Sequence, residues 1–392
     1  MLKKYALLVL LAFFFLSIKA QQKNLSAKAE ISVLTIGAGK NLNDAFGHSA
    51  FRIKDPVNRF DIIFDYGRFD FNAPNFYLNF VKGKLNYALG SNNFQDFLQY
   101  YIQVERSVKE QVLNLTQSEK QKLFNFLLNN YKPENRYYLY EFFFDNCATK
   151  IRDVIQETQN NTITFNATEV YKNESFRALI HGNLIQNSWE CFGIDLALGA
   201  VIDKQAKATE YMFLPKHVFT LLNGATTNAS QKKLVKQSHT LNKAPEKQIS
   251  ANVITSPLVV LTIIGCFIIY LTYNDYKKNT RTRWLDISLF TVTGLVGLII
   301  LLLWFATNHL GTKNNYNLLW AFTGNLFVIF QLHKTKSSLW FIGYLKLLII
   351  MLCLLTMHWV TGVQCFNISL LPFLIALCFR YVFLVYYYQK QV

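Results

Sequence analysis

The chain has 392 residues, of which 52% are hydrophobic and only 16% are charged, and its formal net charge is +16. The length allows two or three domains, and the apolar excess argues against an ordinary soluble protein. The positive charge does not indicate a nucleic-acid partner. Many lysines and arginines flank hydrophobic runs, where they set membrane topology, and no nucleic-acid-binding motif accompanies them.

The first twenty residues predict a secretory signal peptide. A positively charged start is followed by an apolar run to Ile18 and by the small residue Ala20, as in cleaved leaders. An uncleaved anchor helix is the alternative. Cysteine does not follow the cleavage position, so the chain is not itself a lipoprotein. The expected organisation is a signal peptide at 1–20, an exported domain at 21–245 and a membrane domain at 246–392.

Short strands and three helices are predicted in the exported part. The strand-like runs are Ile31–Ile36, Ala50–Ile53, Arg59–Tyr66 and Ser107–Leu113, with a short helix and another strand within Phe69–Leu89. Thr116 and Glu119 form a capping-box pattern that opens a helix to Tyr131. Cys147–Glu157 fits an amphipathic helix. The basic segment 204–250 is interpreted as the exit from this domain and a linker.

Five later apolar runs are long enough to be considered as membrane spans. They are Ile254–Tyr273, Trp284–Ala306, Leu318–Leu332, Leu339–Val360 and Ile368–Tyr387. A spanning helix needs about 20 residues, so the third run is the shortest and the least secure. Tryptophans and tyrosines lie near the ends of these runs, as interfacial aromatics do.

The loop charges give the orientation independently of the signal peptide. If the domain before the first span is exported, the loop 274–283 is cytoplasmic, and it carries four basic residues and one acid. The loops 308–317 and 361–367 then lie outside and hold a single basic residue. Both patterns predict a multi-pass membrane protein with an exported N-terminal domain and a cytoplasmic C-terminus.

The segment Asp145-Asn146-Cys147-Ala148-Thr149 is the best candidate for chemistry. A cysteine at the start of a helix has its sulfur near unpaired amides, which stabilise a thiolate and can hold an oxyanion. Asn146 or Asp145 can cap that helix. A buried structural cysteine, or a disulfide between Cys147 and Cys191, is the alternative. The six cysteines show neither paired nor metal-ligand spacing, so no metal and no cofactor is predicted.

A thiol nucleophile needs a base, and His48 is the histidine in the most suitable setting. It lies at the start of a predicted strand within Gly-His-Ser-Ala-Phe-Arg-Ile, whereas His181 and His217 have no comparable surroundings. Asp65, on the next strand, is the residue we expect to hold its second ring nitrogen. Without the cysteine motif, His48 would more simply be interpreted as a structural histidine.

These segments together resemble one protein family. The motifs are Ile31-Ser-Val-Leu-Thr-Ile-Gly37, Asp44-Ala-Phe-Gly-His-Ser-Ala-Phe-Arg-Ile53, Tyr66-Gly-Arg-Phe-Asp-Phe71, Phe80-Val-Lys-Gly-Lys84, Phe143-Phe-Asp-Asn-Cys-Ala-Thr149 and Met212-Phe-Leu-Pro215. They are similar to those of Lnb, the lipoprotein N-acyltransferase of the Bacteroidota. The resemblance extends over nearly the whole chain, including its membrane part.

The resemblance implies an α+β fold, a circularly permuted papain-like (NlpC-type) domain with histidine before cysteine, followed by a transmembrane bundle of about five helices. It implies Cys147 as nucleophile and His48 as base, with Asp65 as a further member of the site. It also implies a phospholipid as acyl donor and a diacylated lipoprotein as acceptor. The membrane it implies is a bacterial inner membrane, with the exported domain in the periplasm. Acyl transfer then proceeds through a thioester on Cys147 to the α-amine of the acceptor's lipidated cysteine.

Four other residues receive expected roles. We expect Asn146 and Ser49 to contact substrate beside the thiol, and His309 to do so from the polar external loop 308–317, although an ordinary solvated loop would look the same. Arg380 lies within the fifth run. It is expected to extend toward the cytoplasmic surface or to bind a lipid phosphate.

Three other functions stay open at this stage. The same catalytic residues would suit a membrane-anchored cysteine peptidase or amidase acting on cell-wall peptides, which would not need the membrane part. A degenerate fold would suit a non-enzymatic sensor or assembly factor, which would not need Cys147. An intramolecular transacylase would move a chain within one lipoprotein and leave a lyso form.

Overall fold

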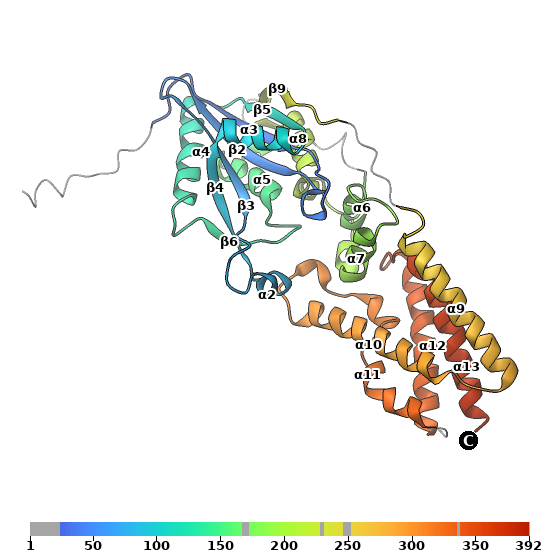
Figure 1. The fold of residues 1–392 in the computed structure, drawn as a ribbon. Coiled ribbons are helices and arrows are strands. Elements are labelled where there is room, and N and C mark those ends of the chain that lie inside the picture. The colour runs from blue at the N-terminus through green and yellow to red at the C-terminus, as the bar shows by residue number, and fades with distance from the viewer. Residues whose placement is uncertain (1–23, 167–171, 228–230, 246–251, 335–337, 392) are drawn as a thin grey trace, which may run out of the picture.

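The computed structural model describes residues 24–166, 172–227, 231–245, 252–334 and 338–391, and the predicted signal peptide lies outside them. Figure 1 shows a sheet-rich domain at one end of the molecule and a helical bundle at the other, with α2 (Phe76–Val81) and α7 (Trp189–Ala197) where the two meet. The mixed α/β architecture with a helical membrane part is the fold class expected from the sequence.

A seven-stranded sheet forms the first domain, in the order β6-β4-β3-β2-β1-β5-β9, and each neighbouring pair is antiparallel. The strands are β1 (Glu30–Ile36), β2 (His48–Asp55), β3 (Phe60–Arg68), β4 (Asn86–Asn93), β5 (Val108–Leu113), β6 (Tyr137–Leu139) and β9 (Val235–Asn242). Two further short strands, β7 (Ile163–Thr164) and β8 (Thr226–Thr227), pair with each other.

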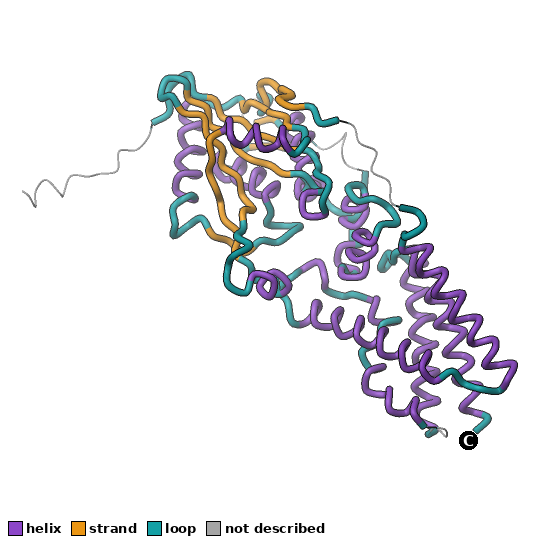
Figure 2. Tube along the Cα trace, viewed as in Figure 1, coloured by secondary structure: helices purple, strands orange, loops and turns teal. Residues whose placement is uncertain are grey.

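Helices cover both faces of this sheet (Figure 2), because side chains alternate between the two faces along each strand. Val33 and Phe51 pack with α4 (Gln117–Asn130), α5 (Cys147–Thr158) and α8 (Pro215–Gly224). Their neighbours Leu34 and Ala50 pack with α3 (Phe94–Gln103) on the opposite face. The predicted capping box of α4 is confirmed, with Thr116 and Glu119 bonded reciprocally.

The segment 204–250 was wrongly interpreted as a linker. It contains η3 (Ala208–Phe213) and α8, and β9 then pairs with β5 as the edge strand of the sheet. The strand was not recognised because most of its side chains are exposed and polar, so it lacks the alternation of a half-buried strand. Its pairing partner, rather than its composition, determines its structure.

Four helices among the described residues are long and apolar enough to span a membrane: α9 (Pro257–Lys278), α10 (Arg283–Phe305), α12 (Leu339–Val360) and α13 (Leu371–Gln389). The third predicted span is present among the described residues but is not one continuous helix. It is broken into η5 (Tyr316–Leu319), α11 (Asn325–Val328) and η6 (Ile329–His333).

This broken segment nevertheless runs the length of the bundle. At its start, the Tyr316 backbone N–H donates to Gln364, in a loop beside the sheet domain, and at its end the Leu332 carbonyl accepts from Arg281 at the opposite end. Polar side chains explain why it is irregular, because Asn325 bonds Thr293 of α10 and Tyr344 of α12 inside the bundle. The chain therefore passes through the bundle five times.

Glycines on α10 let the broken segment approach closely. A methyl group at Gly297 would overlap the carbonyl oxygen of Ala321, and one at Gly294 would come within 2.7 Å of Leu326. Gly343 on α12, by contrast, has open space around its Cα within the described residues. We expect Gly297→Ala to destabilise the bundle by about 1–3 kcal/mol through overpacking.

The matched variant Gly343→Ala should be neutral or stabilising by up to about 1 kcal/mol, since alanine is the better helix former. Thermal unfolding of both variants in detergent provides the comparison. Equal stability of the two variants would contradict close packing of the broken segment against α10.

Arg380 does not extend to the surface, which corrects the expectation for this residue. Its guanidinium is fully buried and donates to Asp286 (2.6 Å) and Asp275 (2.8 Å), with a further bond to the carbonyl of Thr282. Arg281 lies 3.5 Å from the second carboxylate oxygen of Asp286. The four charges form a balanced cluster that joins α9, α10 and α13.

Candidate active site

Cys147 is the first residue of α5, and the loop before it is held rigidly. The Asn146 side chain caps the helix by accepting from the N–H groups of Ala148 and Thr149, and it donates to the carbonyls of Phe142 and Phe213. Thr149 completes a capping box by accepting from the Asn146 N–H. The thiol therefore lies at a fixed helix N-terminus, where the dipole favours a thiolate.

His48 faces this thiol from the start of β2. Gly47 has a φ of +84°, and a Cβ there would come within 2.7 Å of the Ile36 carbonyl oxygen, so the turn into the strand requires glycine. His48 Nε2 donates to Asp65 Oδ2 (3.2 Å), which leaves Nδ1 for the thiol. The side chain of Arg68 donates to the other oxygen of Asp65 (2.7 Å).

The sheet is open at this point. Pairing between β2 and β3 runs only from Phe51 to Asp55 on β2, so the backbone of Ser49 is not used by β3. The Ser49 N–H donates to the sulfur of Cys147 instead. The structure thus brings together three of the predicted site residues, Cys147, His48 and Asp65, and places Ser49 beside them.

Mutual electrostatics favour a charged cysteine–histidine pair. Burial raises the pKa of the Cys147 thiol, but the attraction and hydrogen bond of His48 outweigh it, so the pKa is lower than usual. Burial likewise lowers the pKa of His48, but the Cys147 thiolate and Asp65 raise it well above its ordinary value. For Asp65, burial is outweighed by His48 and Arg68, which lower its pKa. A thiolate and an imidazolium are the consistent states.

The charged pair of Cys147 and His48 predicts how the reactivity of the thiol depends on pH. Removing the imidazole in His48→Ala leaves burial to raise the thiol pKa, so alkylation of Cys147 by iodoacetamide at pH 7 should slow and its profile should move to higher pH. Mass spectrometry of the Cys147 peptide in the full-length protein measures this rate. The control is His239→Ala, because His239 is exposed on β9. If the pH dependence of Cys147 alkylation is unchanged in His48→Ala, a thiolate–imidazolium pair of Cys147 and His48 is contradicted.

Tyr138 and Tyr140 are two site residues that the sequence reasoning missed. Gly67 has a φ of +92°, and a Cβ on it would lie 3.6 Å from Cys147 Cβ, 3.8 Å from Tyr140 and 4.0 Å from the Tyr138 hydroxyl. That hydroxyl is buried and has no hydrogen-bond partner among the described residues. Burial and the charge of the Cys147 thiolate raise the pKa of both tyrosines, which keeps them protonated. The run Tyr-Tyr-Leu-Tyr before the cysteine was the only available signal.

Two of the expected substrate contacts are otherwise engaged. The Asn146 amide is buried and uses both its oxygen and its nitrogen to hold the loop, so it positions Cys147 rather than facing a substrate. The His309 side chain is engaged with α2, where its Nε2 donates to the carbonyl of Phe80 (3.0 Å). The Ser49 side chain is buried, and its backbone is what meets the thiol.

The loop 308–317 is a joint between the two domains rather than an ordinary solvated loop. The Gly199 N–H donates to the Gly311 carbonyl (2.9 Å), and Asn315 donates to carbonyls at the end of α7. A methyl group at Gly311 would come within 2.6 Å of the ring of Phe143, four residues before Cys147. The membrane part therefore supports the loop that carries the thiol.

A second cluster strengthens this joint. Asp195 on α7 accepts from Arg177 (2.9 Å) and His181 (2.8 Å), while its other oxygen accepts from Asn367 of the loop before α13 (2.9 Å). The cluster also includes Cys191, with ligand atoms of His181, Cys191 and Asp195 within 4.8 Å of one another, a spacing that could hold a metal ion. Arg177 also donates to Asp203 through two nitrogens, and the bond from Asn367 ties Asp195 to the membrane part, so we assign the cluster to domain docking.

The cysteines are all free, so the alternative of a disulfide between Cys147 and Cys191 is not seen. Burial and the adjacent Asp195 raise the pKa of Cys191 to about 11, which makes its thiol unreactive at neutral pH. Only Cys147 among the two buried thiols therefore has the electrostatic setting of a nucleophile.

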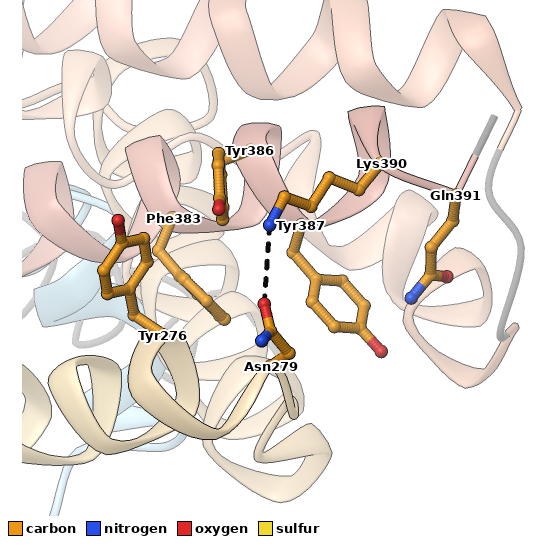
Figure 3. A pocket seen from close by; sticks show the side chains of 7 residues that line it. All are labelled: Tyr276, Asn279, Phe383, Tyr386, Tyr387, Lys390 and Gln391. Carbon is orange, nitrogen blue, oxygen red and sulfur yellow. Dashed lines mark hydrogen bonds between the residues drawn. The ribbon is translucent and has the colours of Figure 1, made fainter.

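A pocket between α9 and α13 lies at the wrong end of the molecule for this chemistry (Figure 3). Tyr276, Asn279, Phe383 and Lys390 line it, and Lys390 donates to Asn279 (3.4 Å). These residues lie at the end of the bundle away from the sheet domain (Figure 1). We therefore place the active site at Cys147.

Comparison with known families matches both parts of the chain. Residues 18–182 match the family model described as the Lnb N-terminal periplasmic domain, and residues 248–391 match the one described as the Lnb transmembrane domain. The first match contains Cys147, His48 and Asp65. No curated protein and no solved structure matches the chain, so the permuted papain-like topology stays a prediction.

Proposed function

Because the chain belongs to the Lnb family, we propose that it is a lipoprotein N-acyltransferase that carries the acyl chain on Cys147. The observation that supports this most strongly is the Cys147–His48–Asp65 group at a helix N-terminus, in a domain docked on a membrane bundle. The donor is a membrane phospholipid, and the acceptor is the α-amine of a diacylated lipoprotein's N-terminal cysteine.

In the first half-reaction the Cys147 thiolate attacks an ester carbonyl carbon of the phospholipid. The tetrahedral oxyanion is stabilised by the Cys147 N–H, which has no partner within the described residues, and by the Tyr138 hydroxyl. The carbon–oxygen bond then breaks, and the His48 imidazolium donates its proton to the departing alkoxide. A lysophospholipid leaves, and a thioester remains on Cys147.

In the second half-reaction the neutral amine of the lipoprotein attacks the thioester. His48, now neutral, takes the amine proton, and the carbon–sulfur bond breaks. The product is an amide-linked third chain, and Cys147 returns to the thiolate beside imidazolium His48. One site thus serves two substrates in turn, and Asp65 keeps the imidazole oriented through both steps.

The role of Tyr138 predicts a specific kinetic defect. Tyr138→Phe keeps the ring and removes the donor, so kcat should fall by about 10²–10³-fold while KM changes little, as for loss of an oxyanion-hole donor. Tyr137→Phe is the matched control, because Tyr137 is the neighbouring residue and its side chain is exposed. Steady-state transfer to a lipopeptide acceptor measures both values. An unchanged kcat in Tyr138→Phe would exclude the hydroxyl from the transition state.

We also propose that the C-terminus is cytoplasmic. The loop 279–282 and the end of α13 lie together, since Lys390 bonds Asn279, and this end of the bundle carries the basic residues of the cytoplasmic loops. The loops 308–317 and 361–370 contact the sheet domain, which the family places in the periplasm. Five passages, one of them broken, connect the two sides.

Mass spectrometry of lipoprotein N-terminal peptides, from cells with and without this protein, tests the function. Three acyl chains that depend on the protein, with lysophospholipid as co-product, support transfer between molecules. Two chains, one of them on nitrogen, would instead indicate transfer within one lipoprotein. If the number of acyl chains on the N-termini does not depend on the protein, acyl transfer is rejected, and a peptidase or a sensor becomes the better hypothesis.

A further inference from the structure

The segment 69–84, which contains α2, exposes an unusual number of large apolar side chains. Tyr77 is 77% exposed and Phe71 is 63% exposed. Phe69, Leu78, Phe80 and Val81 in the same segment are also exposed. A soluble domain rarely leaves so many neighbouring aromatic and aliphatic groups in water without a partner.

This segment lies where a spanning helix leaves the membrane. The Asn308 N–H, three residues after α10, donates to the Lys82 carbonyl (2.9 Å), and His309 donates to the carbonyl of Phe80 (3.0 Å). Phe305, the last residue of α10, is itself 70% exposed, as a lipid-facing residue would be. Figure 1 shows α2 at the end of the sheet domain that faces α10.

An aromatic path leads from this surface toward the thiol. The ring of Phe76 on α2 contacts Phe69, and Phe69 contacts Tyr87 on β4 at a centroid distance of 5.3 Å. Tyr87 stacks on Tyr140 at 4.3 Å, and Tyr140 borders the same space beside Gly67 as Cys147. These rings form an unbroken packed row from α2 to the space beside the nucleophile, and Phe76 and Tyr87 within the row are buried.

We propose that the segment 69–84 is a membrane-surface element that inserts its exposed aromatic face into the outer lipid layer of the membrane. Continuity with the outer end of α10 specifies a lipid surface as the partner. The exposed basic side chains of Lys82 and Lys84 suit the phosphate layer beside it. The path from Phe76 to Tyr140 then leads the ester of a lipid to Cys147, and this part rests on the proposed acyl transfer.

Photo-cross-linking of the full-length protein in phospholipid nanodiscs tests the surface without any need for activity. A benzophenone amino acid replaces Tyr77 in one variant and Val57 in the control. Val57 is also exposed, but it lies in the turn at the other end of β3. The proposal expects phospholipid adducts at position 77 and only background at position 57. Absence of lipid adducts at position 77, or equal adducts at both positions, would overturn it.

A second measurement tests the path to the thiol. In Tyr77→Glu with Leu78→Glu, transfer from bilayer phospholipid should fall by about tenfold or more, the order expected when a large apolar side chain can no longer be buried. Alkylation of Cys147 by water-soluble iodoacetamide should not change, and Val57→Glu should retain full transfer.

The two proposals fail in different ways. If the wild-type protein transfers no acyl chain, the proposed function is rejected. Lipid adducts at position 77 would still support the segment 69–84 as a membrane-surface element. If the wild-type protein transfers acyl chains and the double glutamate variant transfers them equally well, the path to Cys147 is overturned, while the proposed function stands.

Discussion

We expect Cys147→Ala to abolish N-acylation of lipoproteins while the protein still accumulates in the membrane. The thiolate is the only group proposed to hold the acyl chain, so its loss removes both half-reactions rather than slowing one. In a comparable nucleophile deletion the rate falls by about 10⁶-fold. Folding should survive, because Cys147 is small, and the cap of α5 depends on Asn146 and Thr149.

Cys266→Ala is the matched control, since that cysteine is exposed on α9 and has no place in the mechanism. Acyl transfer to a lipopeptide by each purified variant, with a labelled phospholipid as donor, is the assay. Retained transfer in Cys147→Ala would exclude the thioester route and would favour a non-enzymatic role or another nucleophile.

The second large effect concerns stability. Arg380→Leu leaves Asp286 and Asp275 buried with Arg281 as the one remaining cation of the cluster. Removing one partner of a buried ion pair costs about 3–5 kcal/mol. Thermal unfolding in detergent should therefore show a large loss. The alternative of a lipid-binding Arg380 predicts instead that the variant unfolds normally and loses only lipid affinity.

A double variant separates charge balance from packing. Arg380→Leu with Asp286→Leu leaves Asp275 and Arg281 as one acid and one base, so the cluster is again neutral. We expect this variant to be more stable than Arg380→Leu alone. If it is less stable, the loss comes from packing and hydrogen bonds rather than from the uncompensated charge.

Local rules were enough to place much of the site from sequence. Asn146 before Cys147 and Thr149 form a helix start whose chemistry is contained within four residues, and the structure shows that cap. His48 follows Gly47 at a strand start, and Asp65 lies on the next strand, so the sheet brings them together. Each of these inferences needed only near neighbours along the chain or adjacent strands.

Residues that depend on distant partners were not predictable in the same way. The Tyr138 hydroxyl belongs to the site only because it meets Cys147 across the space beside Gly67. Arg380 is buried only because Asp275 and Asp286 come from two other helices. The break in the third span likewise depends on Asn325 meeting Thr293. Hydropathy measures the apolar content of a run, but it does not register such partners.

The most direct test of the account is detection of the acyl-enzyme itself. The full-length protein is incubated in nanodiscs with a phospholipid carrying an isotope-labelled acyl chain, without acceptor, and is then digested for mass spectrometry. The account predicts the labelled chain on the Cys147 peptide, its release by neutral hydroxylamine as expected of a thioester, and its transfer when a lipopeptide amine is added. Transfer of label to the lipopeptide without any label on Cys147 would contradict it.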